Sequence, residues 1–238
     1  MFHLSTPLYL GLFLHKIACI TLFNFPPPMY IPTFNCASDK KEIAAFMHDH
    51  GFATVITQAA GVPWASHLPV LLDEAGGGPH GILRSHMARA NEQWQHFKPT
   101  EEVLCIFNGP HSYISPTWYV SKMMVPTWNY ATVHVYGFPQ LVEEPASLRK
   151  ILDDTVAKYE AKRSNPWKME FPQDTVDGLM KAIVGFTLNI THIEAKFKLE
   201  QNRSVKDQAG MLQELTNSPD PESQSLAAFI QRQKKTGQ

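Results

Sequence analysis

The chain has 238 residues, of which 44% are hydrophobic and 18% are charged, and its formal net charge is -1. This length suits one domain with an extension, and this balance of residues is typical of a globular protein. Non-specific binding to nucleic acid requires clustered Lys and Arg, so direct DNA binding is doubtful. The 3 cysteines show no CxxC spacing and cannot all pair, and Cys105 lies within the apolar run VLCIF. A reducing, cytoplasmic compartment is therefore expected.

The first 28 residues differ from the rest of the chain. Two apolar stretches, Leu8–Leu14 and Ile17–Phe23, are divided by His15-Lys16, and each is too short to span a bilayer. A secretory signal would have a positive region before the apolar segment and a clear small-residue cleavage site, which this stretch lacks. Three prolines then precede Met29, which resembles a fresh start. We expect no membrane span, and we interpret residues 1–28 as an extension, disordered or a mis-assigned start; a targeting segment is the alternative.

A helix and a series of strands are predicted next. Asp39 followed by Glu42 resembles a capping box, and the helix that it begins would end at Gly51. Strands are then predicted over Gly51–Thr57 and Val62–Glu74, joined as a hairpin through residues 58–61. A glycine turn at 76–78 leads into a third strand over residues 80–87, and a short helix over residues 91–97 follows, with its first residue as the cap.

Further strands are predicted over Glu101–Phe107, near Ser112–Tyr119 and over Asn129–Glu144. Strands joined by tight turns, with one short helix inserted, indicate a small antiparallel barrel rather than a parallel sheet with crossover helices. The predicted fold class is therefore mainly β with additional helices.

The second half of the chain adds helices and one long strand. Apolar residues at helical spacing predict a helix over residues 148–159 and a shorter one over residues 176–183. Over Val184–Leu199 the apolar residues alternate and then change parity, which predicts a β-bulge near Thr191-His192. Two tail helices are expected around residues 207–215 and 223–234. We expect the domain to occupy residues 29–215 and a helical tail to occupy residues 216–238.

The sequence contains no strong motif for a metal site or for a catalytic nucleophile. His48 and His50 lie two residues apart, a poor spacing for joint ligation on one helical face, and there is no HExxH or GxSxG motif. Ser66 and His67 are neighbours on a predicted strand, so their side chains point to opposite faces. The string GGGPHG lacks the Lys-Ser/Thr ending of a phosphate loop and is interpreted as a hairpin tip. No metal site is expected, and no catalytic residue is assigned.

An anion-binding group is predicted where the third strand ends. His86 closes this strand, Arg89 lies in the turn, and Asn91 begins the short helix. An Arg fork, free backbone N–H groups and the positive end of a helix dipole would together suit a phosphate, although a surface Arg beside an ordinary helix cap is the alternative. Ser66 and His67 lie on the preceding strand, which a hairpin could place beside this group.

Aromatic residues crowd the next part of the chain. Trp118, Tyr119, Trp128 and Tyr130 could stack on a planar ring, pack between subunits or simply belong to the core. Their mixture with Ser115, Lys122 and Asn129 favours an interface lined by ligand.

Six strings in order carry a resemblance to a known family: MYIPTF, SHLP, HMARANEQW, GPHSYISPTWY, VPTWNYATVHVYG and EAKFKLEQNR. From about Met29 to about Leu215 the chain resembles the PaiB family of FMN-binding negative transcriptional regulators. The family belongs to the flavin-binding split-barrel group, related to pyridoxamine-phosphate-oxidase-like proteins. The resemblance implies a split barrel and a homodimer that binds FMN at the subunit interface.

The resemblance also implies roles for single residues. Ser66, His67 and Leu68 would lie near the flavin or its ribityl phosphate chain, Arg89 and Asn91 with His86 would hold the phosphate, and Trp118, Tyr119, Trp128 and Asn129 would line the ring or the dimer seam. The late block departs from the family pattern KLSQNR, since Glu200 stands in place of Ser.

Two functions remain open on this evidence: an FMN-binding regulator or flavin sensor, and a flavin-dependent oxidoreductase acting on a small molecule. A structural module without flavin is a more distant third. The sequence offers no helix-turn-helix with a basic recognition face, which weakens direct operator binding.

Overall fold

A computed structural model describes residues 29–236, so the predicted extension over residues 1–28 lies outside the described residues. Its centre is one antiparallel sheet of seven strands in the order β2-β1-β5-β6-β7-β4-β3. The strands are β1 (Phe52–Ala59), β2 (Val62–Pro69), β3 (Leu71–Gly78), β4 (Gly81–Ala88), β5 (Val103–Ile114), β6 (Thr127–Val142) and β7 (Ile183–Lys198).

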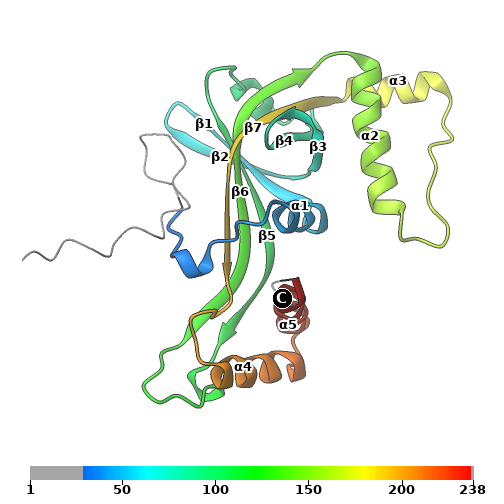
Figure 1. Ribbon diagram of the computed structural model, residues 1–238. Helices are drawn as coiled ribbons and strands as arrows, with labels where there is room; N and C mark the ends of the chain where they lie inside the picture. Colours follow the sequence, from blue (N-terminus) through cyan, green and yellow to red (C-terminus); the bar gives the residue numbers. More distant parts are fainter. Residues whose placement is uncertain (1–28, 237–238) are drawn as a thin grey trace, which may run out of the picture.

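The sheet curls until its two ends approach one another (Figure 1). Within residues 29–236 no backbone ladder joins β2, at one end of the sheet, to β3 or β4 at the other, but two side-chain hydrogen bonds connect β2 to β4 and to the segment that follows β4. Ser85 Oγ donates to the Pro69 carbonyl at 2.7 Å, and Asn91 Nδ2 donates to Ser66 Oγ at 2.8 Å. The result is an incompletely closed barrel, which agrees with the predicted mainly β class with helices.

The first hairpin forms as predicted, although its second strand is shorter. Ala60 and Gly61 both have positive φ, 49° and 78°, which is the geometry of the tight turn that favours a two-residue hairpin. The strand predicted over Val62–Glu74 is wrong in extent, because it divides after Pro69. There β2 leaves β1, and β3 pairs with β4 at the other end of the sheet. A continuous apolar run concealed this change of partner.

The predicted strand near Ser112–Tyr119 is also corrected. β5 continues without interruption to Ile114, with a register shift between Asn108 and His111. The chain then turns into the 3-10 helix η3 (Pro116–Trp118), where Ser115 Oγ accepts from the Thr117 N–H. Proline has no N–H for a ladder, and the serine cap favours a helical turn. Trp118 therefore lies on a short helix rather than on a strand.

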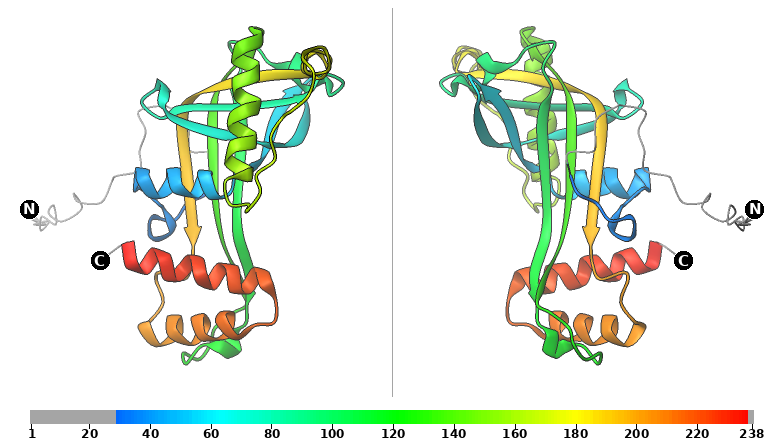
Figure 2. Two further views of the ribbon diagram at one scale, coloured as in Figure 1. Left: turned by 90° about the vertical axis from the view of Figure 1, so that its right-hand side faces the viewer. Right: turned by 90° about the vertical axis from the view of Figure 1, so that its left-hand side faces the viewer.

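The bulge predicted near Thr191-His192 is confirmed. Tyr136 pairs with His192 and Gly137 pairs with Ile190, so Thr191 is the extra residue of β7. Gly137 is required at this point, because a Cβ there would collide with the backbone of Asn189. Both β6 and β7 have 16 residues, and with β5 they extend beyond the barrel as a long ribbon (Figure 2).

Helices cover the two ends of this ribbon. The helices are α1 (Lys40–Asp49), α2 (Pro145–Glu160), α3 (Gln173–Lys181), α4 (Val205–Asn217) and α5 (Pro221–Thr236), with the 3-10 helices η1 (Thr33–Asn35) and η2 (Glu92–His96). The cap predicted for the first helix is confirmed, since Asp39 accepts from two backbone N–H groups. Residues 145–181, which contain α2 and α3, form a helical arm at one end of the ribbon, while α4 and α5 pack at the other end (Figure 1).

The core continues from the barrel into the tail. Buried Phe46 of α1 and Phe197 of β7 pack with Phe229 of α5, with ring centroids 5.1–5.8 Å apart. Leu226 and Ile230 of α5 are buried in the same cluster. The last helix therefore stabilises the ribbon from which the aromatic residues project.

Candidate functional site

A closely bonded polar group, which we call the Asn91 corner, lies where the two ends of the sheet meet. It consists of Ser66 on β2, and of Asn91 and Gln93 at the start of η2. Asn91 donates to Ser66 Oγ and accepts from the Gln93 N–H at 3.2 Å. Gln93 is fully buried, and its Nε2 donates to the carbonyls of Val55 and Trp64 at 2.9 and 3.1 Å and to Thr57 Oγ1 at 3.2 Å. The cap predicted at Asn91 is confirmed, but η2 is a 3-10 helix of 5 residues, so its helix dipole is small.

Arg89 lies two residues before the corner, and two nitrogens of its guanidinium already donate to backbone carbonyls. Its Nε and Nη2 donate to the carbonyls of Lys181 and Ile183, both at 2.8 Å, and its own N–H donates to the Ala182 carbonyl. Nη1 has no hydrogen-bond partner among residues 29–236. The guanidinium therefore fixes the start of β7 and retains one nitrogen for an anion.

The other three residues of the predicted anion group point elsewhere. His67 lies on the outer face of the sheet, where its Nδ1 is 3.0 Å from Thr54 Oγ1. Leu68 belongs to the core. His86 is half-buried beside buried Ser85 and Met87, and burial lowers the pKa of its imidazole, which favours the neutral form. In one chain, Ser66 and Asn91 lie together with Arg89 nearby, while the other three do not converge on them.

The predicted ring-binding residues gather at the opposite end of β6, and only one of them is exposed. Trp128 is 54% exposed and lies near the rings of His111 and Tyr113, with centroids 6.1 and 6.2 Å away. Trp118 and Tyr119 pack against the core. Asn129 is fully buried and donates to Met211 Sδ on α4 at 3.1 Å. Trp128 is thus the one ring of this set that a ligand could stack on directly.

These two groups are far apart within one chain. The ladder row of Ser66 passes through Val55 and Cys105 and reaches β6 at Val135. From there, Trp128 lies about 23 Å further along β6 at the usual strand rise, in addition to the sideways separation of β2 from β6. One chain therefore does not place both groups around the same small cofactor.

Two residues beneath the aromatic end were not assigned from the sequence. Lys198 Nζ donates to Thr127 Oγ1 and to the Trp128 carbonyl, and desolvation lowers the pKa of its ammonium. Lys196 lies 5.4 Å from the ring centroid of Tyr130. Their alternation within the EAKFKL string places both on the outer face, a signal that was present in the sequence.

Glu200, which stands where the family pattern has Ser, forms an ion pair within its own chain. It is 5% exposed, has a φ of 62°, and accepts from Arg203 Nε. Burial, together with the Glu200 charge, raises the pKa of Tyr119 to about 12. The carboxylate at this position therefore binds its own arginine, and the late block braces the loop that follows η3.

Asp207 holds the same loop from α4. Its carboxylate accepts from the N–H groups of Val120 and Ser121, both at 2.9 Å, and from the hydroxyls of Ser121 and Ser204 at 2.6 and 2.7 Å. These hydrogen bonds, led by that of the Ser121 hydroxyl, lower the pKa of Asp207 to about 2. The Ser-x-x-Asp spacing of a helix cap could have revealed this contact.

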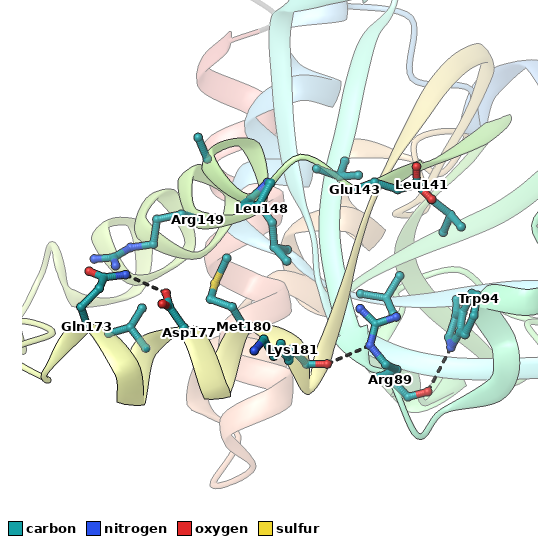
Figure 3. A pocket seen from close by; sticks show the side chains of 15 residues that line it. Arg89, Trp94, Leu141, Glu143, Leu148, Arg149, Gln173, Asp177, Met180 and Lys181 are labelled. Atoms are coloured by element: carbon teal, nitrogen blue, oxygen red, sulfur yellow. Dashed lines mark hydrogen bonds between the residues drawn. The ribbon is translucent and has the colours of Figure 1, made fainter.

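A cavity of about 840 Å³ opens between the helical arm and the end of the barrel (Figure 3). Of the residues predicted to bind the cofactor, Arg89 alone lines it. Its other walls come from residues distant in the sequence, on η2, β6, α2, α3 and β7. Within residues 29–236, no helix is long and apolar enough to cross a membrane, and no cluster of three or more His, Cys, Asp or Glu side chains could hold a metal ion.

Comparison with known proteins identifies the family. The profile described as "Putative FMN-binding domain" matches residues 29–192. The "Protease synthase and sporulation protein PAI 2" of Bacillus subtilis (strain 168) is 37% identical over 205 residues, which cover 85% of this chain and 97% of that protein.

Solved structures support the fold. The flavocytochrome Anf3 from Azotobacter vinelandii aligns with a TM-score of 0.54 and 14% identity, covering 74% of this chain and 75% of its own. The FAD and heme binding protein from Mycobacterium smegmatis aligns with a TM-score of 0.54 and 11% identity, covering 74% and 78%. This likeness concerns the fold, and it confirms the predicted split barrel.

The residues present fit FMN in chemical terms. The unpartnered Nη1 of Arg89 and the hydroxyl of Ser66 suit a phosphate tail, and the exposed ring of Trp128 suits a planar heterocycle. Since the profile covers more than half of the chain, and the Bacillus protein aligns over most of both sequences, the chain belongs to the PaiB family of FMN-binding proteins.

Proposed function

We propose that this protein is a cytoplasmic FMN-binding regulator or flavin sensor that acts as a homodimer, with FMN at the subunit interface. The observation that carries the proposal is the separation between the Asn91 corner and Trp128 within one chain. A two-fold axis makes each interface contact twice. It would bring the Trp128 end of one subunit to the Asn91 corner of the other and create two equivalent sites.

Exposed aromatic residues on the sheet support association. Phe52, Trp64 and Tyr113 are 66%, 41% and 45% exposed, although each lies on or beside a strand of the barrel or ribbon. Large apolar side chains on a sheet face are characteristic of surfaces that bind a partner.

The roles within this site follow from the contacts. Ser66, Asn91 and Arg89 Nη1 would bind the phosphate and ribityl chain, with Leu68 and His86 supporting their strands and His67 facing the partner. Trp128 would stack on the ring, while Trp118, Tyr119 and Asn129 would position it from beneath. FMN supplies the redox chemistry when bound, and the protein binds, orients and shields it.

A regulatory role is favoured over catalysis because the site lacks an evident proton donor or nucleophile. Burial raises the pKa of Cys105, which keeps the thiol protonated, and burial lowers the pKa of His86 and His134. The net charge of -1 argues against operator contact by this chain alone. Regulation would then be indirect, through a change in the flavin or in the dimer.

Purified protein tests the proposal. FMN titration should saturate at one flavin per chain, and light scattering should give the mass of a dimer. A colourless protein that ignores added FMN would exclude the proposed function. Anaerobic mixing with NADH or NADPH separates sensor from enzyme: slow or absent flavin reduction agrees with the proposal, whereas rapid bleaching and reoxidation would favour the oxidoreductase alternative.

A further inference from the structure

The cavity beside the helical arm has the composition of a ligand site that is separate from the Asn91 corner. Its floor consists of Leu148, Val176 and Val184, which are 7%, 5% and 6% exposed, together with half-buried Met180. A volume of about 840 Å³ lies within the range of small-molecule pockets. The floor could therefore bury an apolar body of that size.

The charged side chains of the cavity differ in how far they are already paired. Arg149 is bonded to Asp153 through Nε at 2.8 and 3.0 Å, and Asp177 accepts from Gln173 at 2.7 Å. The Lys181 ammonium has no partner among residues 29–236, and it lies on the wall shared with Arg89, whose Nε bonds the Lys181 carbonyl. Figure 3 shows Glu143 beside Leu141, away from that wall. An unpaired cation thus faces an apolar floor.

We propose that this cavity binds a small amphipathic anion, with the apolar part on Val176 and Met180 and a single carboxylate, sulfonate or phosphate group at Lys181. Arg89 adds positive charge to the same wall. The proposal does not rest on FMN binding, because the three residues that would bind the anion, Val176, Met180 and Lys181, are not among those assigned to FMN.

The position of the cavity also connects it to the corner. Trp94 lines the cavity, and its Nε1 donates to the Arg89 carbonyl at 3.0 Å. The short segment from Arg89 to Trp94 contains Asn91 and Gln93, so a ligand in the cavity contacts both ends of the segment that forms the corner. Such a ligand could change flavin affinity, and the coupling would be reciprocal.

The test uses the whole chain saturated with FMN and the fluorescent probe 8-anilinonaphthalene-1-sulfonate, an aromatic monoanion. Binding should saturate near one probe per chain. Met180→Trp fills the cavity and Lys181→Ala removes the charge, and each should weaken the probe at least about tenfold, a change of about 1.4 kcal/mol. The matched controls are Leu179→Trp, since Leu179 is 51% exposed on the same helix and does not line the cavity, and Lys168→Ala on the exposed arm loop. Both should stay within about twofold of the unsubstituted protein.

Circular dichroism and thermal unfolding establish whether each variant keeps its fold. Dodecanoate should displace the probe and dodecylamine should not, and equal displacement by both would overturn the charge assignment. Equal losses in the variants and their controls would indicate surface binding and would also overturn the proposal. Stoichiometric displacement of the probe by FMN, measured from the FMN-free state, would show that the cavity belongs to the flavin site. Flavin absorbance is recorded separately, so a protein that fails to bind FMN can still give a positive result for the cavity.

Discussion

The Asn91 corner and the Trp128 end of the ribbon differ in how far their side chains are held by hydrogen bonds within the chain. At the corner, the side chains of Ser66, Asn91 and Gln93 bond to one another and to the backbone. At the ribbon end, the loop backbone is held by Asp207 while Trp128 remains half exposed. The chain thus completes its polar group alone and presents its aromatic group outward, which is the division expected of a site shared between two subunits.

The two regions therefore differ in how rigid they are in the single chain. A buried amide with three hydrogen bonds fixes its neighbours in the free chain, so a ligand there meets an ordered surface. The half-exposed ring of Trp128 follows a loop in which Met123 is 100% exposed with a φ of 62°, so this ring gains its order from whatever covers it. We therefore expect substitutions at the corner to change the stability of the single chain more than substitutions of the exposed ring do.

Replacing Gln93 with Leu should break the corner. The carbonyls of Val55 and Trp64 would lose a buried donor, and the free energy of unfolding should fall by about 3 kcal/mol. Urea denaturation measures the loss. The control is Gln95→Leu, since Gln95 is exposed on the same short helix and should change little. Similar small effects for both variants would mean that the corner is not rigid.

Replacing Arg89 with Ala should weaken FMN more than riboflavin. A charge-assisted bond to phosphate contributes about 1.5–3 kcal/mol, and riboflavin has no phosphate. Fluorescence titration with both flavins gives the two dissociation constants, and exposed Arg163→Ala provides the control for charge. Because Arg89 also bonds the backbone of the arm, thermal unfolding must accompany the titration. Equal losses for the two flavins would place the phosphate elsewhere.

Asp207→Asn should loosen the Trp128 end in a manner that depends on pH. The pKa of Asp207 is lowered from 3.8 to about 2 in the folded protein, so its carboxylate stabilises the fold above pH 3.8 and loses this effect as the pH falls towards 2. The variant should have a lower Tm than the unsubstituted protein at neutral pH, and the gap should narrow across that window. A gap that stays constant down to pH 2 would rule out this origin.

Trp128→Ala should have the smallest effect on the fold itself. Its ring is half exposed, so the free energy of unfolding of the isolated chain should change by no more than about 0.5 kcal/mol. The affinity for FMN and the fraction of dimer should nevertheless fall. Titration measures the affinity, and light scattering measures the dimer. A stable, dimeric variant with unchanged flavin affinity would exclude Trp128 from the proposed flavin site.

Local patterns predicted the features that depend on neighbours in sequence. The parity change in residues 184–199 located the bulge, and the Asp39 and Asn91 caps were readable from residue type and spacing. The change of partner strand after Pro69 could not be predicted, because an apolar run does not indicate which strand it will pair with.

The site was less predictable than the fold. Ser66 and Asn91 were assigned to one group, and the structure brings them to 2.8 Å, but through the curl of the sheet rather than through a hairpin. His67 points to the opposite face of β2 from Ser66, as an adjacent strand residue must, whereas Leu68 shares the face of Ser66 but is buried in the core. The cavity has no local signature at all, since its walls come from segments that meet only in the folded chain.

The extra residue at Thr191 has a consequence for how the two ends of the molecule are aimed. Ile190 and Ile193 both face inward, and His192 between them faces outward, so deleting Thr191 would leave a regular strand with every inward residue still inward. We expect the fold to survive this shortening. The deletion would remove the bend that a bulge gives a strand. The ribbon would then carry Trp128 away from the barrel in a different direction. Thr191 would thus be dispensable for the folding of each chain, while the proposed pairing of two subunits around FMN would depend on it.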